Sequence, residues 1–321
     1  SHQSLLFMRR VFVGSIGVLT LLIIQACSRT PEAEVVAADG ALCDITHRLA
    51  ATDLRVQCLL DPDDDPHQLQ LTPEQSRQLR EAQLVLINGY GLTPALDQLP
   101  GAVKVAEIAV PASPALPANK PSDHHHDHGH AHGDQDPHVW HDPRQAAAMT
   151  ALASEQLQAL NPAAAAQIQA RSTAMQNSLK ALHSWNKQQF GTIPAPRILA
   201  SSHRAFTSLT RAYDLEELPV IDATSTSESL RPQALASVVS SLKQRRVRSL
   251  FADQSPPSKS LERISSLSGV PLAKQPLMAD ATGDSLMATL TRNTCLIVDA
   301  LGGACNRQGA EALVQRWDAI R

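Results

Sequence analysis

The chain has 321 residues, which is enough for about two domains that each bury their own core. Its net charge is −3, and no cluster of Lys or Arg is interleaved with aromatic residues, which argues against a nucleic-acid partner. Aromatic residues make up only 3% of the chain, so we expect a core of aliphatic side chains. The 13 histidines are unusual in such a composition, and their positions indicate where to look for function.

The N-terminal segment is typical of an export signal. Two arginines precede an apolar stretch over residues 11–24, which has signal-peptide length and is short for a membrane-spanning helix. The stretch ends in the sequence IQAC, which resembles the lipobox of bacterial lipoproteins and closes with Cys27. We expect residues 1–27 to be a lipoprotein signal peptide and lipobox, with Cys27 anchoring an exported, periplasmic or otherwise extracytoplasmic protein in the membrane. A membrane helix with a chance cysteine is the alternative.

The remaining cysteines form an even set of four. Because disulfides persist outside the reducing cytoplasm, export favours disulfides over thiolate metal ligands at these positions. Pairing between neighbours is the simplest arrangement, and it would join Cys43 to Cys58 and Cys295 to Cys305. Four buried free thiols are the alternative.

Short apolar runs alternate with helix-like stretches, which is typical of parallel α/β sheets. In the first half, the pattern predicts one helix at 72–81 and strands at 35–37, 56–60, 84–87 and 103–108. In the second half, it predicts helices at 232–243 and 259–268, and strands at 197–200, 218–221, 248–252 and 276–279.

The middle of the chain separates these two halves. Residues 111–135 are rich in Pro, His, Asp and Gly without apolar periodicity, which predicts a long mobile loop. Residues 143–193 are dense in helix formers and have one internal proline, which predicts two helices, the second over about 163–190. The domains expected from this pattern are an N-terminal α/β lobe over 36–160, a connecting helix over 161–192 and a C-terminal α/β lobe over 195–321.

Four motifs with metal-binding side chains stand at predicted strand or loop ends, where α/β sheets present functional groups. They are Asp65-Pro66-His67, Asp136-Pro137-His138-Val139-Trp140, Ser201-Ser202-His203-Arg204-Ala205-Phe206 and Met278-Ala279-Asp280. Three imidazoles and one carboxylate complete the four-coordinate shell that Zn²⁺ commonly accepts. A closed shell of this kind suits binding better than catalysis.

In this order, the motifs resemble those of the zinc and manganese solute-binding proteins of bacterial ABC importers. The resemblance runs from about residue 43 to residue 303. It implies two lobes, each with a parallel β-sheet flanked by helices, joined by a long rigid helix, with the metal in the cleft between the lobes. It also implies an importer permease as partner and His67, His138, His203 and Asp280 as ligands. Manganese members carry a carboxylate where His203 stands, so the nitrogen there favours Zn²⁺, with Mn²⁺ as the alternative.

Two departures from the family pattern leave other ligands open. His141 stands where family members often have Leu, and it is an alternative or an additional ligand to His138. The spacing from Asp280 to Asp284 is shorter than usual, so Asp284 is an alternative to Asp280. Asp253 follows a predicted strand and is expected either to orient a ligand imidazole or to serve as a turn residue.

The predicted loop holds a second, looser set of imidazoles. They are His124, His125, His126, His128, His130 and His132. Mobile imidazoles bind transition metals weakly, because no fixed geometry is prepared. We expect this loop to capture or sense zinc, and the alternative is a tolerated low-complexity insertion.

The sequence therefore predicts a monomeric extracytoplasmic protein that captures Zn²⁺ and delivers it to an ABC-type importer. We expect no enzyme, because His-Glu-x-x-His is absent and no Glu stands beside the ligand motifs as a general base. The alternatives are a manganese-binding protein of the same importer class and a metal-buffering or adhesive surface lipoprotein. Metal affinity is expected to fall below about pH 6.5, the reference pKa of histidine.

Overall fold

The computed structural model describes residues 34–113, 115, 135–221, 231–280, 282, 283 and 285–321. The predictions for Cys27, for the six loop histidines and for Asp284 therefore lie outside the described residues. All the described residues belong to one compact unit. Within the described ranges, no helix is both long and apolar enough to span a membrane.

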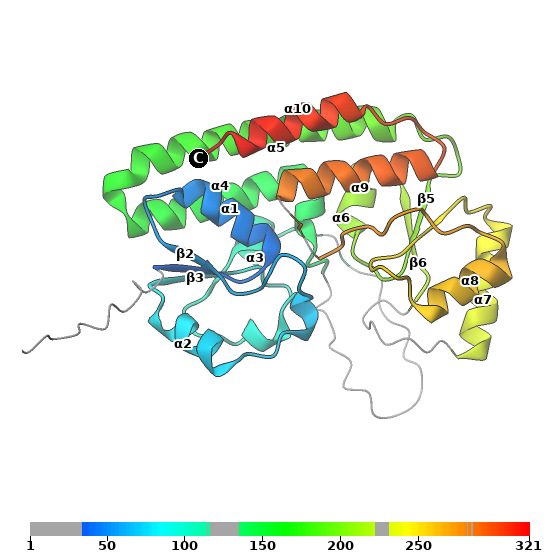
Figure 1. Cartoon of the computed structure of the whole chain (residues 1–321), viewed down its shortest axis with the longest axis horizontal. Helices are drawn as coiled ribbons and strands as arrows, with labels where there is room; N and C mark the ends of the chain where they lie inside the picture. Colours follow the sequence, from blue (N-terminus) through cyan, green and yellow to red (C-terminus); the bar gives the residue numbers. More distant parts are fainter. Residues whose placement is uncertain (1–33, 114, 116–134, 222–230, 281, 284) are drawn as a thin grey trace, which may run out of the picture. The chain divides into compact units, whose positions relative to one another are not determined.

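The first half of the chain folds around a four-stranded parallel sheet (Figure 1). In spatial order its strands are β2 (Val56–Cys58), β1 (Val35–Ala37), β3 (Leu84–Ile87) and β4 (Val103–Lys104). The helices of this half are α1 (Gly40–Ala50), α2 (Pro73–Glu81), α3 (Val105–Ala109) and α4 (Pro143–Leu160).

Both faces of this sheet are covered, which explains why its strands read as continuous apolar runs. Val35 and Leu86 face the core that contains α1 and α4. Val36 and Val85, the adjacent residues on the same two strands, face Leu79 of α2 on the other side. The side-chain alternation along each strand thus supplies two separate apolar cores.

The second half folds around a three-stranded parallel sheet. In spatial order its strands are β6 (Glu216–Pro219), β5 (Ile198–Ser201) and β7 (Leu250–Phe251). The helices of this half are α6 (Thr207–Ala212), α7 (Pro232–Gln244), α8 (Lys259–Ser268), α9 (Leu286–Ala300) and α10 (Arg307–Asp318). One face packs against α7 and α8, and the other packs against α6 and α9.

The long helix α5 (Ala165–Phe190) follows the short turn η4 (Pro162–Ala164) and has 26 residues, a length of roughly 39 Å. Leu179 of α5 belongs to the core of the first half, whereas Phe190 at its end belongs to the core of the second half. Helix α9 likewise places Leu290 in the first core and Ile297 in the second. Two helices therefore pack into both halves, and Figure 1 shows α5 running beside α10.

The predicted fold class is confirmed, and six of the eight predicted strands agree with observed strands to within two residues. The prediction of a strand over 103–108 is wrong beyond its first two residues. Only Val103–Lys104 pairs with β3, and helix α3 begins at Val105. A short apolar run does not distinguish a strand from a buried helical turn. Two disulfides join Cys43 to Cys58 and Cys295 to Cys305, as the simplest pairing predicted.

Candidate metal centre

His67 lies on the 3-10 turn η1 (Pro66–Gln68), in the connection that follows β2. Asp65 begins this turn, and its side chain accepts a hydrogen bond from the backbone N–H of His67 at 2.9 Å. Pro66 presets the backbone angle of the first turn position. The tripeptide Asp-Pro-His therefore folds locally into a capped turn that carries the imidazole.

His138 stands directly before the turn η3 (Val139–His141) and repeats the same local motif. Oδ1 of Asp136 accepts a hydrogen bond from the backbone N–H of His138 at 2.9 Å and lies 3.3 Å from its Nδ1. Oδ2 of Asp136 accepts hydrogen bonds from the backbone N–H and the hydroxyl of Ser208 in α6, at 3.1 and 2.6 Å. One buried carboxylate thus orients the His138 ring and connects it to the second half of the chain.

His203 follows β5, and Asp253 follows the neighbouring strand β7. The register pairs Ser201 with Phe251, so residues two positions further along each strand lie side by side. Nδ1 of His203 donates a hydrogen bond to Oδ2 of Asp253 at 2.6 Å. Because this carboxylate accepts the Nδ1 proton, Nε2 is the ring atom directed at a cation. Asp253 therefore orients the His203 ring, which is the first of the two roles expected for it.

Asp280 does not follow a strand, which corrects the strand predicted at 276–279. Asn293 of α9 holds the preceding segment instead, because its Oδ1 accepts from the backbone N–H of Met278 at 3.0 Å. Its Nδ2 donates to the backbone carbonyl of the same residue at 2.8 Å. A buried amide side chain thereby satisfies both backbone groups that a partner strand would satisfy.

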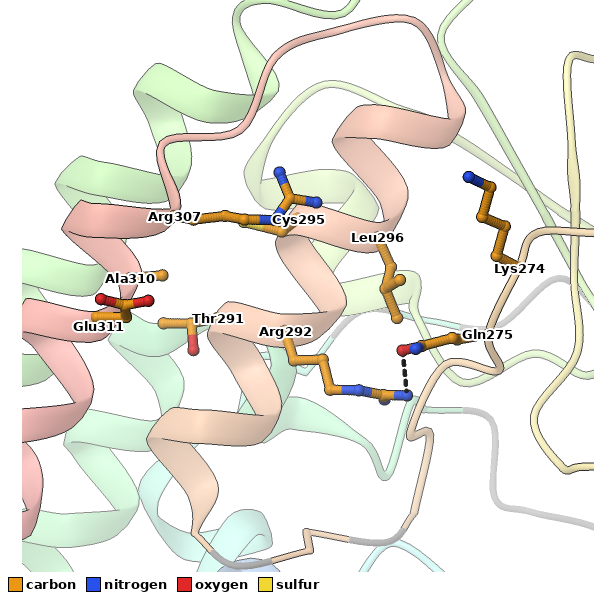
Figure 2. A pocket seen from close by; sticks show the side chains of 9 residues that line it. All are labelled: Lys274, Gln275, Thr291, Arg292, Cys295, Leu296, Arg307, Ala310 and Glu311. Carbon is orange, nitrogen blue, oxygen red and sulfur yellow. Dashed lines mark hydrogen bonds between the residues drawn. The ribbon is translucent and has the colours of Figure 1, made fainter.

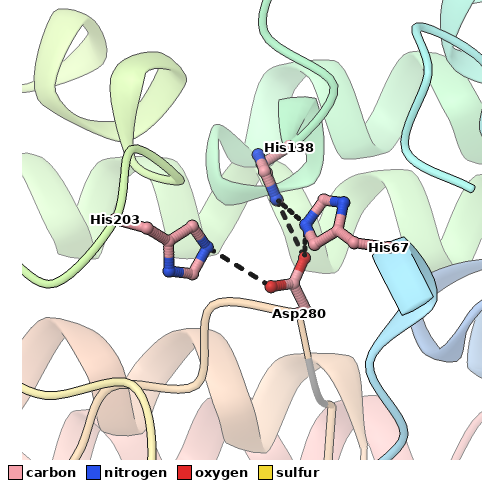
Figure 3. A group of neighbouring side chains, drawn as sticks. All are labelled: His67, His138, His203 and Asp280. Carbon is pink, nitrogen blue, oxygen red and sulfur yellow. Dashed lines mark hydrogen bonds and ion pairs between the residues drawn. The ribbon is translucent and has the colours of Figure 1, made fainter. Parts of the chain in front are cut away.

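The structure brings His67, His138, His203 and Asp280 together, and their ligand atoms all lie within 4.8 Å of one another (Figure 3). Oδ1 of Asp280 is 2.9 Å from Nε2 of His138 and 3.1 Å from Nε2 of His67. The two Nε2 atoms of His67 and His138 are 3.3 Å apart, and Nε2 of His203 is 3.4 Å from Oδ2 of Asp280. In a tetrahedral shell with bonds of about 2.0–2.1 Å, neighbouring ligands are about 3.3 Å apart. The distances among Oδ1 of Asp280 and Nε2 of His67 and His138 are therefore close to those of such a shell, and the ligand atom of His203 lies within 4.8 Å of the others.

Charge and burial shift the pKa values of this group strongly. Burial lowers the pKa of His138, but Asp280 and Asp136 outweigh this effect and raise it to about 9. Burial also lowers the pKa of His203, whereas hydrogen bonds to Asp253 and Asp280 raise it to about 10. Burial raises the pKa of Asp280, yet the neighbouring imidazoles hold it well below its usual range. At neutral pH the metal-free site therefore holds protons that an entering cation must displace.

His141, the alternative ligand, lies outside this group of four. Its ring is buried, and its Nε2 is 2.7 Å from the carbonyl oxygen of Ala279. Burial, followed by the charge of His138, lowers the pKa of His141 to about 4, so the ring is neutral. The other alternative, Asp284, lies outside the described residues.

A second group of metal-binding side chain types consists of Cys43, His47 and Cys58. The two cysteines form a disulfide, so neither sulfur carries the thiolate that binds a metal ion. The covalent bond accounts for the closeness of the two sulfur atoms.

Sequence reasoning missed the positioning roles of Asp136 and Asn293. The signal for Asp136 was present, because an Asp begins both Asp-Pro-His motifs and accepts a hydrogen bond from the backbone N–H of the His in each. No local signal marks Asn293, which lies 15 residues after Met278 in the sequence and meets it only through folding.

A separate surface pocket of about 440 Å³ lies beside α9 and α10 (Figure 2). It is lined by Lys274, Gln275, Thr291, Arg292, Cys295, Leu296, Arg307, Ala310 and Glu311. Arg292 donates hydrogen bonds to Oε1 of Gln275 at 3.2 Å and to the carbonyl oxygen of Pro276 at 3.3 Å. None of these residues belongs to the group formed by His67, His138, His203 and Asp280. Arg292 instead holds residues 275 and 276, which precede Asp280 in the chain.

The chain is similar in sequence to known metal-binding proteins. The model of a family described as zinc-uptake complex component A, periplasmic (ZnuA), matches residues 35–300. The zinc-binding protein TroA of Treponema pallidum is 25% identical over 278 residues, covering 83% of this chain and 88% of TroA. The manganese ABC transporter substrate-binding lipoprotein PsaA of Streptococcus pneumoniae is 23% identical over 276 residues, covering 84% and 89% of the two chains.

Solved structures agree with the fold. The structure of the periplasmic zinc-binding protein TroA from Treponema pallidum has a TM-score of 0.73 at 26% identity, covering 84% of this chain and 99% of TroA. The Fe(III)-bound structure of YtgA from Chlamydia trachomatis has a TM-score of 0.75 at 22% identity, covering 85% and 99%. Both likenesses extend over most of this chain and confirm its α/β architecture.

Proposed function

The chain belongs to the periplasmic zinc-uptake component A (ZnuA) family, and on this premise we propose that it captures Zn²⁺ for delivery to an ABC-type importer. The proposed ligands are Nε2 of His67, His138 and His203, together with the carboxylate of Asp280. In this proposal the protein is exported and anchored through Cys27, and it docks onto a permease that removes the ion.

The convergence of these four side chains is the observation that carries the proposal. His67 and His138 are 71 residues apart, and His138 and Asp280 are 142 apart, yet their ligand atoms have tetrahedral spacing. Desolvating three imidazoles and a carboxylate in one place is costly unless an interaction compensates for it. Asp136 and Asp253 add hydrogen bonds that aim two of the rings, which is the usual support of a metal site.

The donor set supports zinc over manganese. Three nitrogens and one carboxylate suit Zn²⁺, whereas Mn²⁺ prefers oxygen-rich sites with more ligands. The named metals of the relatives differ, being zinc for TroA, manganese for PsaA and Fe(III) for YtgA. Mn²⁺ is therefore the competing cargo, and a titration in which Zn²⁺ and Mn²⁺ compete for the site distinguishes the two.

A closed shell also supports transport over catalysis. Catalytic zinc sites keep one position open for water, whereas four protein ligands fill the tetrahedron. The cargo is then held without chemical change and released intact. The loop histidines at residues 124–132 are proposed as an accessory element that raises the local concentration of zinc.

The first test is metal stoichiometry and competitive titration on the chain beginning after Cys27. We expect one tightly bound Zn²⁺ per chain, with Mn²⁺ bound more weakly. His67→Ala and His203→Ala should each abolish tight binding. His183→Ala is the matched control. His183 lies on α5, its Nδ1 is 3.0 Å from the hydroxyl of Tyr213, and it is not in the group of four. Deletion of residues 116–134 should leave the tight site intact.

Two results of this titration would contradict the proposal. A preference for Mn²⁺ over Zn²⁺ would assign the protein to manganese delivery. Zinc binding that is lost only with the loop deletion would remove the four-ligand site and leave a metal-buffering lipoprotein.

The second test separates delivery from buffering or adhesion. Bacterial cells that depend on this protein should take up radioactive zinc from zinc-poor medium only when both the protein and its permease are present. His203→Ala should abolish this uptake, and His183→Ala should preserve it. Uptake that is unchanged without the permease would contradict a role in import.

A further inference from the structure

His141 touches three of the four chain segments that carry the proposed ligands. It closes the turn η3, which begins directly after His138. Its ring centroid lies 4.9 Å from that of Phe206, three residues after His203. Its Nε2 lies 2.7 Å from the carbonyl oxygen of Ala279, the residue before Asp280. A single side chain therefore connects segments that are far apart in the sequence.

The chemistry of the hydrogen bond defines the state of this ring. A carbonyl oxygen only accepts, so Nε2 must carry the proton and donate it to Ala279. His141 is 1% exposed, and its ring centroid lies 5.3 Å from that of Trp140 and 4.9 Å from that of Phe206. Nδ1 has no hydrogen-bond partner among the described residues. A side chain with its Nε2 committed to a carbonyl is placed to hold the backbone and not to bind the ion.

The Ala279 carbonyl needs such a partner because its segment is not part of a sheet. Asn293 holds Met278 from the side of α9, and His141 holds Ala279 from the side of His138. The peptide group that follows the Ala279 carbonyl leads directly into Asp280. The direction of that carbonyl therefore influences where the Asp280 carboxylate points.

Building on the proposed function, we propose that His141 is a positioning residue that fixes the Ala279–Asp280 peptide against the His138 turn and thereby presets the carboxylate for the ion. Asp280 and His138 are then aligned before metal arrives. Preorganisation of this kind raises affinity, because less conformational freedom is lost on binding.

The test compares His141→Leu with His141→Gln in the protein beginning after Cys27, which retains the compact unit 32–321. Leu keeps an apolar side chain in the aromatic contact but has no donor, whereas the Gln amide restores an N–H at similar reach. Outer hydrogen bonds of metal sites typically change affinity about 10- to 100-fold. We expect His141→Leu to bind one zinc with affinity lowered within this range, and His141→Gln to recover most of the loss.

Hydrogen exchange supplies a readout that does not involve metal. In metal-free His141→Leu, backbone amides of residues 277–280 should exchange faster than in the parent, while those of β5 stay unchanged. His47→Leu is the matched control, because His47 is an exposed residue on α1 and its substitution should alter neither zinc affinity nor exchange. The parent protein should also show a neutral, Nε2-protonated His141 by nitrogen NMR.

Each contrary outcome has a defined meaning. Unchanged zinc affinity and unchanged exchange in His141→Leu would overturn the positioning role. Complete loss of zinc in a folded His141→Leu protein would also overturn it, because it would make His141 a ligand. An NMR signal from the Nδ1-protonated form would overturn it even if neither variant folds. If His67→Ala and His203→Ala keep zinc, the proposed function fails, irrespective of the result at His141.

Discussion

Nδ1 of His203 donates a hydrogen bond of 2.6 Å to Asp253, a residue 50 positions further along the chain. The pairing follows from the parallel register of β5 and β7, which brings the two strand ends together. The carboxylate both aims the ring and selects the tautomer whose Nε2 can bind a cation.

Replacement of Asp253 by Ala should weaken zinc binding. Without the carboxylate, the His203 ring loses its fixed orientation, and outer-shell substitutions of this kind cost about 10- to 100-fold in affinity. Competition with a chromophoric chelator measures the change. Glu155→Ala on the exposed face of α4 removes one carboxylate elsewhere and should leave the affinity unaltered. Equal affinity of Asp253→Ala and the parent would show that the hydrogen bond has no influence on the site.

Zinc binding at pH 7 should release about two protons, because the raised pKa values keep two of the site's imidazoles protonated in the metal-free protein. These are His138, with a pKa of about 9, and His203, with a pKa of about 10. Apparent affinity should therefore rise with pH well beyond 6.5, the value expected from isolated histidine. Calorimetric titrations in buffers with different ionisation enthalpies count the released protons. Zinc binding at pH 7 without proton release would contradict this charge arrangement.

The metal-free protein should lose stability as pH rises. A histidine with a folded pKa above its unfolded value contributes stability that is fully present below about pH 6.5. For His138 and His203 this contribution declines as pH rises and is lost through about pH 9 and 10. The melting temperature of the metal-free chain should fall from pH 6.5 to pH 9.5. His203→Ala should flatten this slope, and an equally steep slope in that variant would assign the effect to other groups.

Asp136→Ala should lower the free energy of unfolding of the metal-free protein by about 3 kcal/mol, because it leaves several buried donors without an acceptor. These donors are the N–H and Nδ1 of His138 and the N–H and hydroxyl of Ser208. Urea denaturation measures the loss. Asp64→Ala is the control, since among the described residues the exposed Asp64 side chain accepts one hydrogen bond, from the backbone N–H of Asp61, and its removal should cost less than about 0.5 kcal/mol. A loss as small in Asp136→Ala would show that water replaces its partners.

Local sequence was sufficient for the elements whose signals lie within a few residues. The helix after Thr72 begins at Pro73, where Thr72 and Gln75 form a capping box within four residues of sequence. The hydrogen bonds from the backbone N–H of His67 and His138 to the Asp two residues earlier are equally local. The four side chains that the family resemblance implied as ligands, His67, His138, His203 and Asp280, lie together in the structure.

Tertiary structure decided the features that depend on distant partners. Helix α3 begins after only two strand residues of the run at 103–108, and the segment before Asp280 forms no strand but is held by Asn293 and by the Ala252 carbonyl. The hydrogen bond of His141 could not be predicted from the local sequence either, because the carbonyl of Ala279 lies 138 residues further along the chain. The sequence by itself determined the candidate side chains and the α/β framework, since these rest on short motifs and on apolar periodicity. Only folding decided which atoms of these side chains converge and how firmly they are held, because hydrogen bonds between remote segments set both.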